Sequence, residues 1–437
     1  MKKLIILLTL ILVCGLFLTS CVDNGTDDGS GNPPAGVDGP DVDGEWDPTA
    51  TVLPVKGGRS GIVVLIHDDG IWSTAVTLDK LYHEYGLVGD VAMLSYKLYD
   101  TATGTEKSDE LTNWRALMDT ERWKIVSHSH THTWWGTTTE NEDGTYTFLE
   151  DEDKMREEIV GSQEILRNLF PGQRVLTFAY PGFTKEKNYV DNVADKIFEL
   201  IYSEKSRKML NDTYISARSG LGLSLSVTTP TLHWSRHYLG KVYASENAWN
   251  YFPAFGFSDS NIDSGKLFKI VDGTTAKALS VLYTHKVVDE LTGGSNEMTT
   301  EAMRSLCEYL SAKVKSGEIW NAHYEDAVLY VREATASRVK LEGDENMLTV
   351  SLTDTLDDEI YNYPLTVRVN VPKEWKAAKI THNGEVFYAV AEKKDDEWVI
   401  DFDIVPDLGD ATVVPVPESD VPKVEEPAKK PPVNAAN

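Results

Sequence analysis

The stretch Gly61-Ile-Val-Val-Leu-Ile-His-Asp-Asp-Gly70 decides the fold of this chain. Its continuous apolar run, mostly β-branched, predicts a strand buried on both faces, as in parallel sheets. Asp68 and Asp69 then follow the strand end, the side of an α/β sheet or barrel on which active sites are built. Gly70 permits a sharp turn, so the two acids need not alternate as strand residues do. Adjacent buried carboxylates repel each other, and a bound cation would offset that cost.

Three histidines follow a second predicted strand further along the chain. Residues 124–127 have the composition of a short strand, and His128, His130 and His132 come directly after it. If the chain turns helical there, His128 and His132 share one face and His130 points elsewhere. Two such imidazoles and one carboxylate make a three-ligand metal site with room for water or substrate. A solvated polar turn is the alternative explanation for the histidines taken alone.

The motifs Asp68-Asp69-Gly70 and His128-Ser129-x-x-His132 together resemble the first two motifs of the polysaccharide deacetylases. These are the NodB-homology or carbohydrate esterase family four enzymes, and the resemblance covers residues 61–336. It implies a distorted (β/α) barrel of the α/β class, with Asp68 as the catalytic base. Asp69, His128 and His132 would then hold a divalent metal. Zinc is the usual metal for two histidines and a carboxylate, and such a site also accepts cobalt or nickel.

The third motif of the family falls at residues 178–183 and departs from the usual pattern. Ala179 stands where the family usually carries an arginine that orients the catalytic base. The resemblance also implies that the backbone amide of Gly182 would donate to the oxyanion. Arg218, at the end of another predicted strand, is a candidate replacement for the missing arginine. A purely structural arginine at this position is the alternative.

Three further residues are candidates for the site. His285 ends a late predicted strand in Leu282-Tyr-Thr-His285, which resembles the Leu-x-x-His motif of the family. The histidine of that motif is the general acid, although a lone histidine at a strand end is also compatible with a structural role. Trp134, beside the second motif, and Tyr180, within the third, are candidates for substrate contacts.

Composition divides the chain into five predicted parts. Short apolar strands alternate with helical segments after Gly61, as in βα units, and the texture changes to alternating β-strands after Ser337. The predicted parts are a lipoprotein signal peptide (1–20), a flexible linker (21–57), a NodB-like deacetylase domain (58–336), a small immunoglobulin-like β-sandwich (337–416) and a disordered tail (417–437).

The first residues indicate export to the cell envelope. Lys2 and Lys3 precede an apolar run that is too short to span a bilayer, as in signal peptides. Leu18-Thr-Ser-Cys21 resembles a bacterial lipobox, which implies cleavage before Cys21 and a membrane anchor through a lipid on its sulfur. An ordinary secretory signal is the alternative. Acids soon after Cys21 favour an outer-membrane lipoprotein exposed at the cell surface.

The overall charge excludes one class of partner. The formal net charge of −27 argues against a nucleic-acid partner, because affinity for nucleic acid depends on basic residues. Neutral and cationic substrates remain compatible with it.

The motifs predict a metal-dependent hydrolase that removes N- or O-linked acetyl groups from an acetylated polysaccharide. Two other classes stay open. Ala179 is compatible with a catalytically degenerate carbohydrate-binding lipoprotein. The same metal site could also serve an amidohydrolase that acts on a non-sugar amide. Every predicted site residue precedes Ser337, so we expect the barrel to keep its chemistry without the sandwich.

Overall fold

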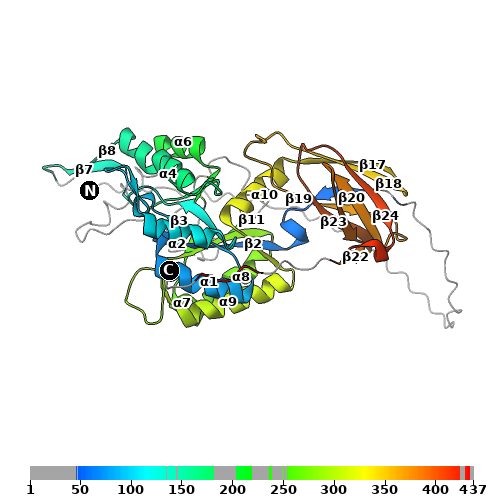
Figure 1. Ribbon diagram of the computed structural model, residues 1–437, viewed down its shortest axis with the longest axis horizontal. Coiled ribbons are helices and arrows are strands. Elements are labelled where there is room, and N and C mark those ends of the chain that lie inside the picture. Colours follow the sequence, from blue (N-terminus) through cyan, green and yellow to red (C-terminus); the bar gives the residue numbers. More distant parts are fainter. Residues whose placement is uncertain are drawn as a thin grey trace, which may run out of the picture. The chain divides into compact units, whose positions relative to one another are not determined.

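The structure is a computed structural model that describes residues 46, 48–133, 135–143, 146–181, 203–218, 236–238, 249, 252, 254–423 and 429–433. In this part of the chain, parallel strands with helices around them are followed by two antiparallel sheets (Figure 1). No helix among these residues is long and apolar enough to cross a membrane.

The predicted first strand forms the centre of a parallel barrel. The barrel strands are β2 (Gly61–His67), β3 (Gly89–Met93), β6 (Trp123–Ser127), β9 (Thr177–Ala179), β10 (Ser216–Arg218), β12 (Ala254–Gly256) and β13 (Ala278–Thr284). They are hydrogen-bonded in the order β10-β9-β6-β3-β2-β13, and β12 pairs in parallel with β13. Phe252, just before β12, forms a parallel bridge to Arg218 of β10. This bridge connects the two ends of the sheet and closes the barrel. The predicted barrel class is confirmed.

Strand β2 is buried along its whole length because each of its faces packs on a different layer. Val63 and Leu65 belong to an apolar cluster shared with the outer helices, whereas Ile62, Val64 and Ile66 belong to the cluster inside the barrel. This arrangement explains why the strand is continuously apolar and does not alternate with polar residues.

Helices cover the outside of the barrel, with α1, α8 and α9 near one another in Figure 1. The helices are α1 (Trp72–Tyr85), α2 (Ser108–Met118), α3 (Glu152–Arg156), α4 (Ser162–Leu169), α6 (Glu204–Thr213), α7 (Asp259–Asp263), α8 (Lys266–Thr274), α9 (Thr300–Lys315) and α10 (Tyr324–Ala336). A π-helical turn, η4 (Glu157–Gly161), lies between α3 and α4. Short 3-10 turns are η1 (Lys56–Gly58), η2 (Asp68–Gly70), η3 (Ser95–Lys97) and η8 (Glu418–Asp420).

Short strands decorate the barrel. They are β4 (Tyr99–Asp100) with β5 (Thr105–Glu106), β7 (Gly136–Glu140) with β8 (Tyr146–Glu150), and β14 (Lys286–Val288) with β15 (Glu297–Thr299). Two more strands join the barrel sheet. β11 (Arg236–Tyr238) pairs antiparallel with β13, and β16 (Ile319–Asn321) pairs in parallel with the first half of β2.

The C-terminal part forms the predicted sandwich of antiparallel sheets. One sheet has the order β17 (Arg338–Asp344), β18 (Met347–Thr353), β24 (Ala411–Val416), β20 (Ala377–His382) and β21 (Glu385–Val390). The other has the order β1 (Ala50–Val52), β19 (Leu365–Asn370), β23 (Glu397–Ile404) and β22 (Glu392–Lys394). Alternate residues of the facing strands are buried, which is the pattern of two sheets that share one core.

The predicted linker ends earlier than residue 57. Ala50–Val52 forms β1, which pairs antiparallel with β19 of the sandwich. The hydroxyl of Tyr330, on α10, donates to the carbonyl of Leu53 at 2.8 Å and fixes the chain that follows. Local composition could not reveal this strand, because its hydrogen-bond partner lies more than three hundred residues later in the chain.

The predicted disordered tail is wrong for the residues that the structure describes near its end. Asp79 and Arg122 form a buried ion pair at 2.9 Å. The carboxylate can accept further hydrogen bonds and the guanidinium can donate further ones. Arg122 donates to the carbonyls of Lys430 (2.6 Å) and Pro431 (3.2 Å), and the amide of Val433 donates to Asp79 at 2.8 Å. A segment without apolar periodicity is therefore held by backbone hydrogen bonds to a buried ion pair.

The barrel and the sandwich share one core. A single apolar cluster contains Ile62 and Val64 of β2, Val328 and Tyr330 of α10, and Val367 of β19. Residues 46–437 accordingly form one compact unit. Removing the sandwich would expose the buried side of α10, so the structure argues against our expectation that the barrel is separable.

Glu333 occupies this shared core. The residue lies on α10 and is fully buried, and both of its carboxylate oxygens accept the Tyr363 amide at 2.9 Å. Burial raises the pKa of Glu333 from 4.5 to about 8, against the opposing effect of that hydrogen bond.

The raised pKa of Glu333 predicts a pH-dependent stability. The folded chain binds more protons than the unfolded chain between pH 4.5 and about 8, so the free energy of unfolding falls as pH rises through this range. Glu333→Gln, which cannot ionise, should remove this part of the slope. Denaturant unfolding measured at several pH values checks it, with Glu359→Gln in an exposed position as the control. Equal slopes for wild type and Glu333→Gln would contradict the expectation.

Candidate active site

The two acids after β2 point in different directions because the backbone turns sharply there. Asp69 takes a left-handed conformation (φ 70°) in the 3-10 turn η2, and Gly70 follows it with φ 54°. A Cβ atom on Gly70 would lie 2.6 Å from the sulfur of Met93, and both this contact and the positive φ favour glycine here. The Asp68 side chain is 3% exposed, whereas that of Asp69 is 28% exposed. The expected departure from strand alternation is present.

The histidines lie on a loop and not on a helix, so the expected helical turn after β6 is wrong. Ser129 and His132 both have positive φ values, of 69° and 63°. The hydroxyl of Ser129 accepts the backbone amide of His132 at 3.1 Å. This loop still brings the rings of His128 and His132 together, with centroids 4.9 Å apart. His130 points elsewhere, as expected, and its Nδ1 lies 2.7 Å from the hydroxyl of Ser95.

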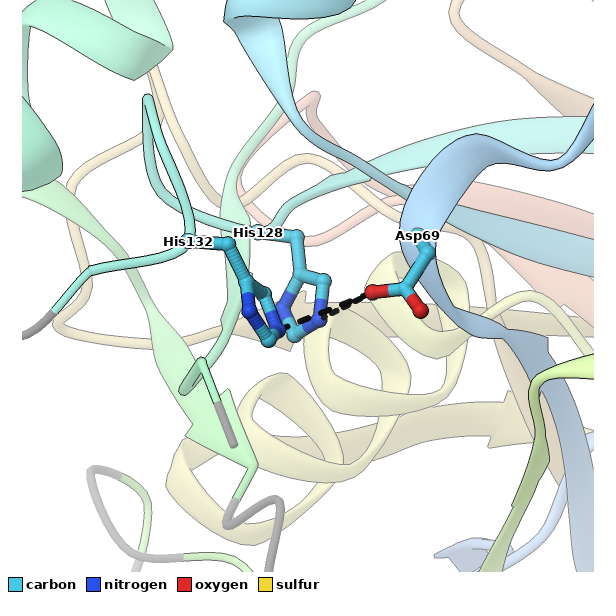
Figure 2. A group of neighbouring side chains, drawn as sticks. All are labelled: Asp69, His128 and His132. Carbon is cyan, nitrogen blue, oxygen red and sulfur yellow. Dashed lines mark ion pairs between the residues drawn. The ribbon is translucent and has the colours of Figure 1, made fainter. Parts of the chain in front are cut away.

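Asp69, His128 and His132 converge on one point (Figure 2). Oδ1 of Asp69 lies 3.6 Å from Nε2 of each histidine, and the three potential ligand atoms are within 4.8 Å of one another. Nδ1 of His128 donates to the carbonyl of Ala179 at 2.9 Å, which leaves Nε2 free to bind a metal. Oδ1 of Asp69 and Nε2 of His128 are buried without a hydrogen-bond partner among the described residues. The donor set therefore fits a divalent cation.

The protonation states also suit a metal. Burial alone would raise the pKa of Asp69, but the interaction with His128 and the charges of His285 and His132 hold it well below its usual range. The pKa of His132 is lowered to about 4, first by burial and then by the charge of His128. Near neutral pH the carboxylate is ionised and His132 is neutral, the forms that coordinate metals.

Arg218, at the end of β10, contacts Asp68, which follows β2. Its guanidinium is fully buried and hydrogen-bonded to Oδ1 of Asp68, and it lies 4.7 Å from the ring centroid of Tyr283. The expected contact is thus present. Arg218 is paired with Ala179 in the register of β10 and β9. The guanidinium therefore comes from the strand next to the one that carries Ala179, at the same level of the barrel.

His285 follows β13, in which Thr284 is paired with His67 of β2, so His285 is level with Asp68. It is half-buried, and its charge contributes to the lowered pKa values of Asp69 and His132. The structure thus places His285 beside the metal-binding residues, and its role as an acid remains a prediction.

Of the remaining predicted residues, the one that the structure describes is not brought to this site. Tyr180 is fully buried against Phe178, with ring centroids 5.7 Å apart, so it presents no surface to a substrate and the predicted contact is wrong. Its backbone amide instead donates to the carbonyl of Arg218 at 3.0 Å, which fixes the end of β10. Gly182 and Trp134 lie outside the described residues.

A pocket next to Asp69 was not predicted. It encloses about 540 Å³ and is lined by Gly70, Ile71, Trp72, Tyr96, Lys97, Lys107, Glu110, Asn113 and Trp114. Lys97 donates to the backbone carbonyl of Asp69 at 2.5 Å, and Tyr96 is 40% exposed. The position of residues 95–97 in the sequence could have indicated this pocket. They follow the end of β3, which lies next to the end of β2 in the sheet.

We expect His132 and His130 to differ sharply in their contribution to metal affinity. His132→Ala removes one of three ligands and should weaken zinc binding by more than about 100-fold, whereas loss of an outer contact costs 10–100-fold. His130→Ala serves as the control, because His130 bonds to Ser95 and not to the cluster. Competition with a chromophoric chelator measures both affinities. Wild-type affinity in the His132 variant would refute the ligand assignment.

Arg218 should be replaceable by an arginine on the neighbouring strand. Arg218→Ala should lower turnover about 100-fold or more by freeing Asp68, with zinc affinity unchanged. Adding Ala179→Arg to that variant should restore part of the turnover, because positions 218 and 179 are paired in register.

Removal of a buried charge partner also destabilises the fold, so a control is needed. Arg332→Lys alters an arginine near Trp249 and Tyr361, away from Asp68, and should affect stability without affecting turnover. Thermal unfolding and turnover of the wild type and the three variants are compared. Full turnover in folded Arg218→Ala would contradict a role for this residue.

No family model matches the chain. The gellan lyase of a Bacillus species is 25% identical over 367 residues, which cover 82% of this chain and 13% of that protein. The carbohydrate esterase family 4 domain of a xylanase from the hindgut metagenome of Trinervitermes trinervoides covers 61% of this chain and 89% of its own, with 12% identity and a TM-score of 0.33. A family 4 pseudoenzyme from Bacillus anthracis covers 61% of this chain and 65% of its own, with 9% identity and a TM-score of 0.32. The chain is similar to the polysaccharide deacetylases in its Asp-Asp-Gly and His-Ser-x-x-His motifs, which it carries on a parallel barrel.

Proposed function

We propose that this protein is a metal-dependent hydrolase that removes acetyl groups from a polysaccharide. The observation that carries the proposal is the convergence of Asp69, His128 and His132 beside an Asp68 that is paired with a buried arginine. One carboxylate has the environment of a metal ligand and its neighbour that of a positioned base. Two adjacent carboxylates with different partners can take different chemical roles.

Each residue near the site has a distinct task in this proposal. A divalent metal held by Asp69, His128 and His132, with zinc as first choice and cobalt or nickel as alternatives, would act as a Lewis acid on the acetyl carbonyl. Asp68 accepts a proton from the attacking water as general base, and its bond to Arg218 keeps it oriented. His285 donates a proton to the leaving amine or alcohol. The Gly182 amide is our candidate donor to the oxyanion.

A saccharide substrate is supported by the pocket beside Asp69. Trp72 and Tyr96 offer aromatic faces, and Lys97, Glu110 and Asn113 offer polar groups, the mixture that binding sites for polar ligands combine. The similarity to a gellan lyase is compatible with a polysaccharide substrate. We leave open whether the acetyl group is N- or O-linked.

The contact between Arg218 and Asp68 favours a working site over a binding-only protein. Ala179 would leave Asp68 without its usual partner, but Arg218 supplies a guanidinium at the same level of the barrel. An amidohydrolase acting on a non-sugar amide would use the same residues, so the nature of the substrate decides between these two classes.

We also propose that the protein acts at the cell envelope. The lipobox-like Leu18-Thr-Ser-Cys21 supports an outer-membrane lipoprotein anchored through Cys21 and exposed at the surface. Labelling of the protein with a radioactive fatty acid, lost in Cys21→Ser, tests the anchor.

Release of acetate tests the function. The protein loaded with zinc should release acetate from at least one of acetylated chitin oligomers, peptidoglycan and acetylated xylan, and a chelator should abolish this release. Asp68→Asn should lower the rate about 100-fold or more, as expected for loss of a general base, while zinc affinity stays within a small factor. Binding to these glycans without acetate release would favour the binding-only alternative. Acetate release from simple acetamides but from no glycan would favour the amidohydrolase.

A further inference from the structure

The loop that carries His132 has a backbone conformation that its own sequence does not favour. Ser129 and His132 both lie in the left-handed region, which is sterically unfavourable for residues other than glycine. Within the loop, the Ser129 hydroxyl accepts only the His132 amide among the bonds that the structure describes for it. Contacts from outside the loop must therefore contribute to the position of the His132 imidazole.

A buried carboxylate makes these outside contacts. Glu158 is 1% exposed, and its Oε2 accepts the backbone amide of Thr131 at 2.8 Å. Its Oε1 accepts the hydroxyl of Thr131 and, at 3.1 Å, the hydroxyl of Thr133. Because these two threonines flank His132 in the sequence, a single carboxylate holds the loop on both sides of the histidine.

Glu158 is presented by a specialised piece of helix. It lies in the π-helical turn η4, and such turns inside α-helices occur frequently at functional sites. The carbonyl of Ile159 in this turn accepts the hydroxyl of Tyr214 at 2.8 Å. Tyr214 lies two residues before β10, the strand that ends in Arg218. The same turn is therefore bonded to the loop of His132 and to the segment that leads to the partner of Asp68.

We propose that Glu158 is a positioning residue that sets the place of His132 and thereby the metal affinity of the site. It acts through Thr131 and Thr133 and makes no contact with the ligand atoms. The inference rests on the proposed function, because that function supplies the metal. It assigns a task to a buried charge that the chemistry at Asp68 does not require.

The substitution is structurally practicable. A hollow of about 550 Å³ at the surface is lined by Thr131, Thr133, Glu157 and Glu158, among others. Water can therefore occupy the space of a removed carboxylate, and shortening the side chain does not create a sealed apolar cavity.

Zinc affinity, measured by competition with a chromophoric chelator on the full chain, tests the proposal. Glu158→Ala should bind zinc 10–100-fold more weakly than wild type, the usual effect of removing an outer-shell contact of a metal site. Glu157→Ala, in the same turn but exposed, is the matched control and should bind as wild type does. The visible spectrum of the cobalt-loaded protein should change in Glu158→Ala and not in Glu157→Ala, because only the former alters the ligand geometry.

A second variant covers the case in which Glu158→Ala fails to fold. Thr131→Val with Thr133→Val, at exposed positions, removes the hydroxyl bonds to Glu158 and keeps the backbone bond, so it should weaken zinc binding by a smaller factor. The proposal is overturned if folded Glu158→Ala has the zinc affinity and the cobalt spectrum of the wild type. If Glu158→Ala does not fold, the same result in the double threonine variant overturns it. Absence of zinc binding by the wild type would instead overturn the proposed function.

Discussion

The buried ion pair between Arg218 and Asp68 is the constraint on which the site depends. It joins the end of the central strand β2 to the end of β10, strands that are far apart in the order of the sheet. An unpaired carboxylate at this depth would be costly, and one partner without the other would destabilise the barrel. The ion pair can therefore form only when the barrel is closed. Phe252 and β12 close it, which brings the ends of β2 and β10 to the same opening.

This pairing also gives two neighbouring acids different surroundings. Asp68 faces a guanidinium inside the barrel, whereas Asp69, turned by its left-handed backbone, faces two imidazoles at the mouth. A regular strand would also send consecutive side chains to opposite faces, but it would bury one of them in the layer of outer helices. The 3-10 turn that ends at Gly70 avoids this and keeps both carboxylates at the end of the barrel.

The rest of the chain supports the barrel through shared burial. Helix α10 contributes to the core of the barrel and to the core of the sandwich, and β1 joins the sandwich from before the first barrel strand. The last described residues return to bond the buried pair of Asp79 and Arg122. These long-range contacts make one compact unit of segments that differ completely in sequence texture, and they account for the errors at the linker and the tail.

The sequence by itself determined the buried parallel strand, the barrel class, the strand-rich C-terminal part and the identity of the clustered residues. These features follow from local patterns, since apolar runs, turn residues and short motifs act over a few positions. Only the tertiary structure decided that a loop, and not a helix, brings His128 and His132 together, and that Tyr180 faces the core. It also decided that Arg218 stands in register with Ala179, and that Glu158 holds the loop of His132. The physical reason is that these relations depend on strand register and on contacts between distant segments, which no local pattern encodes.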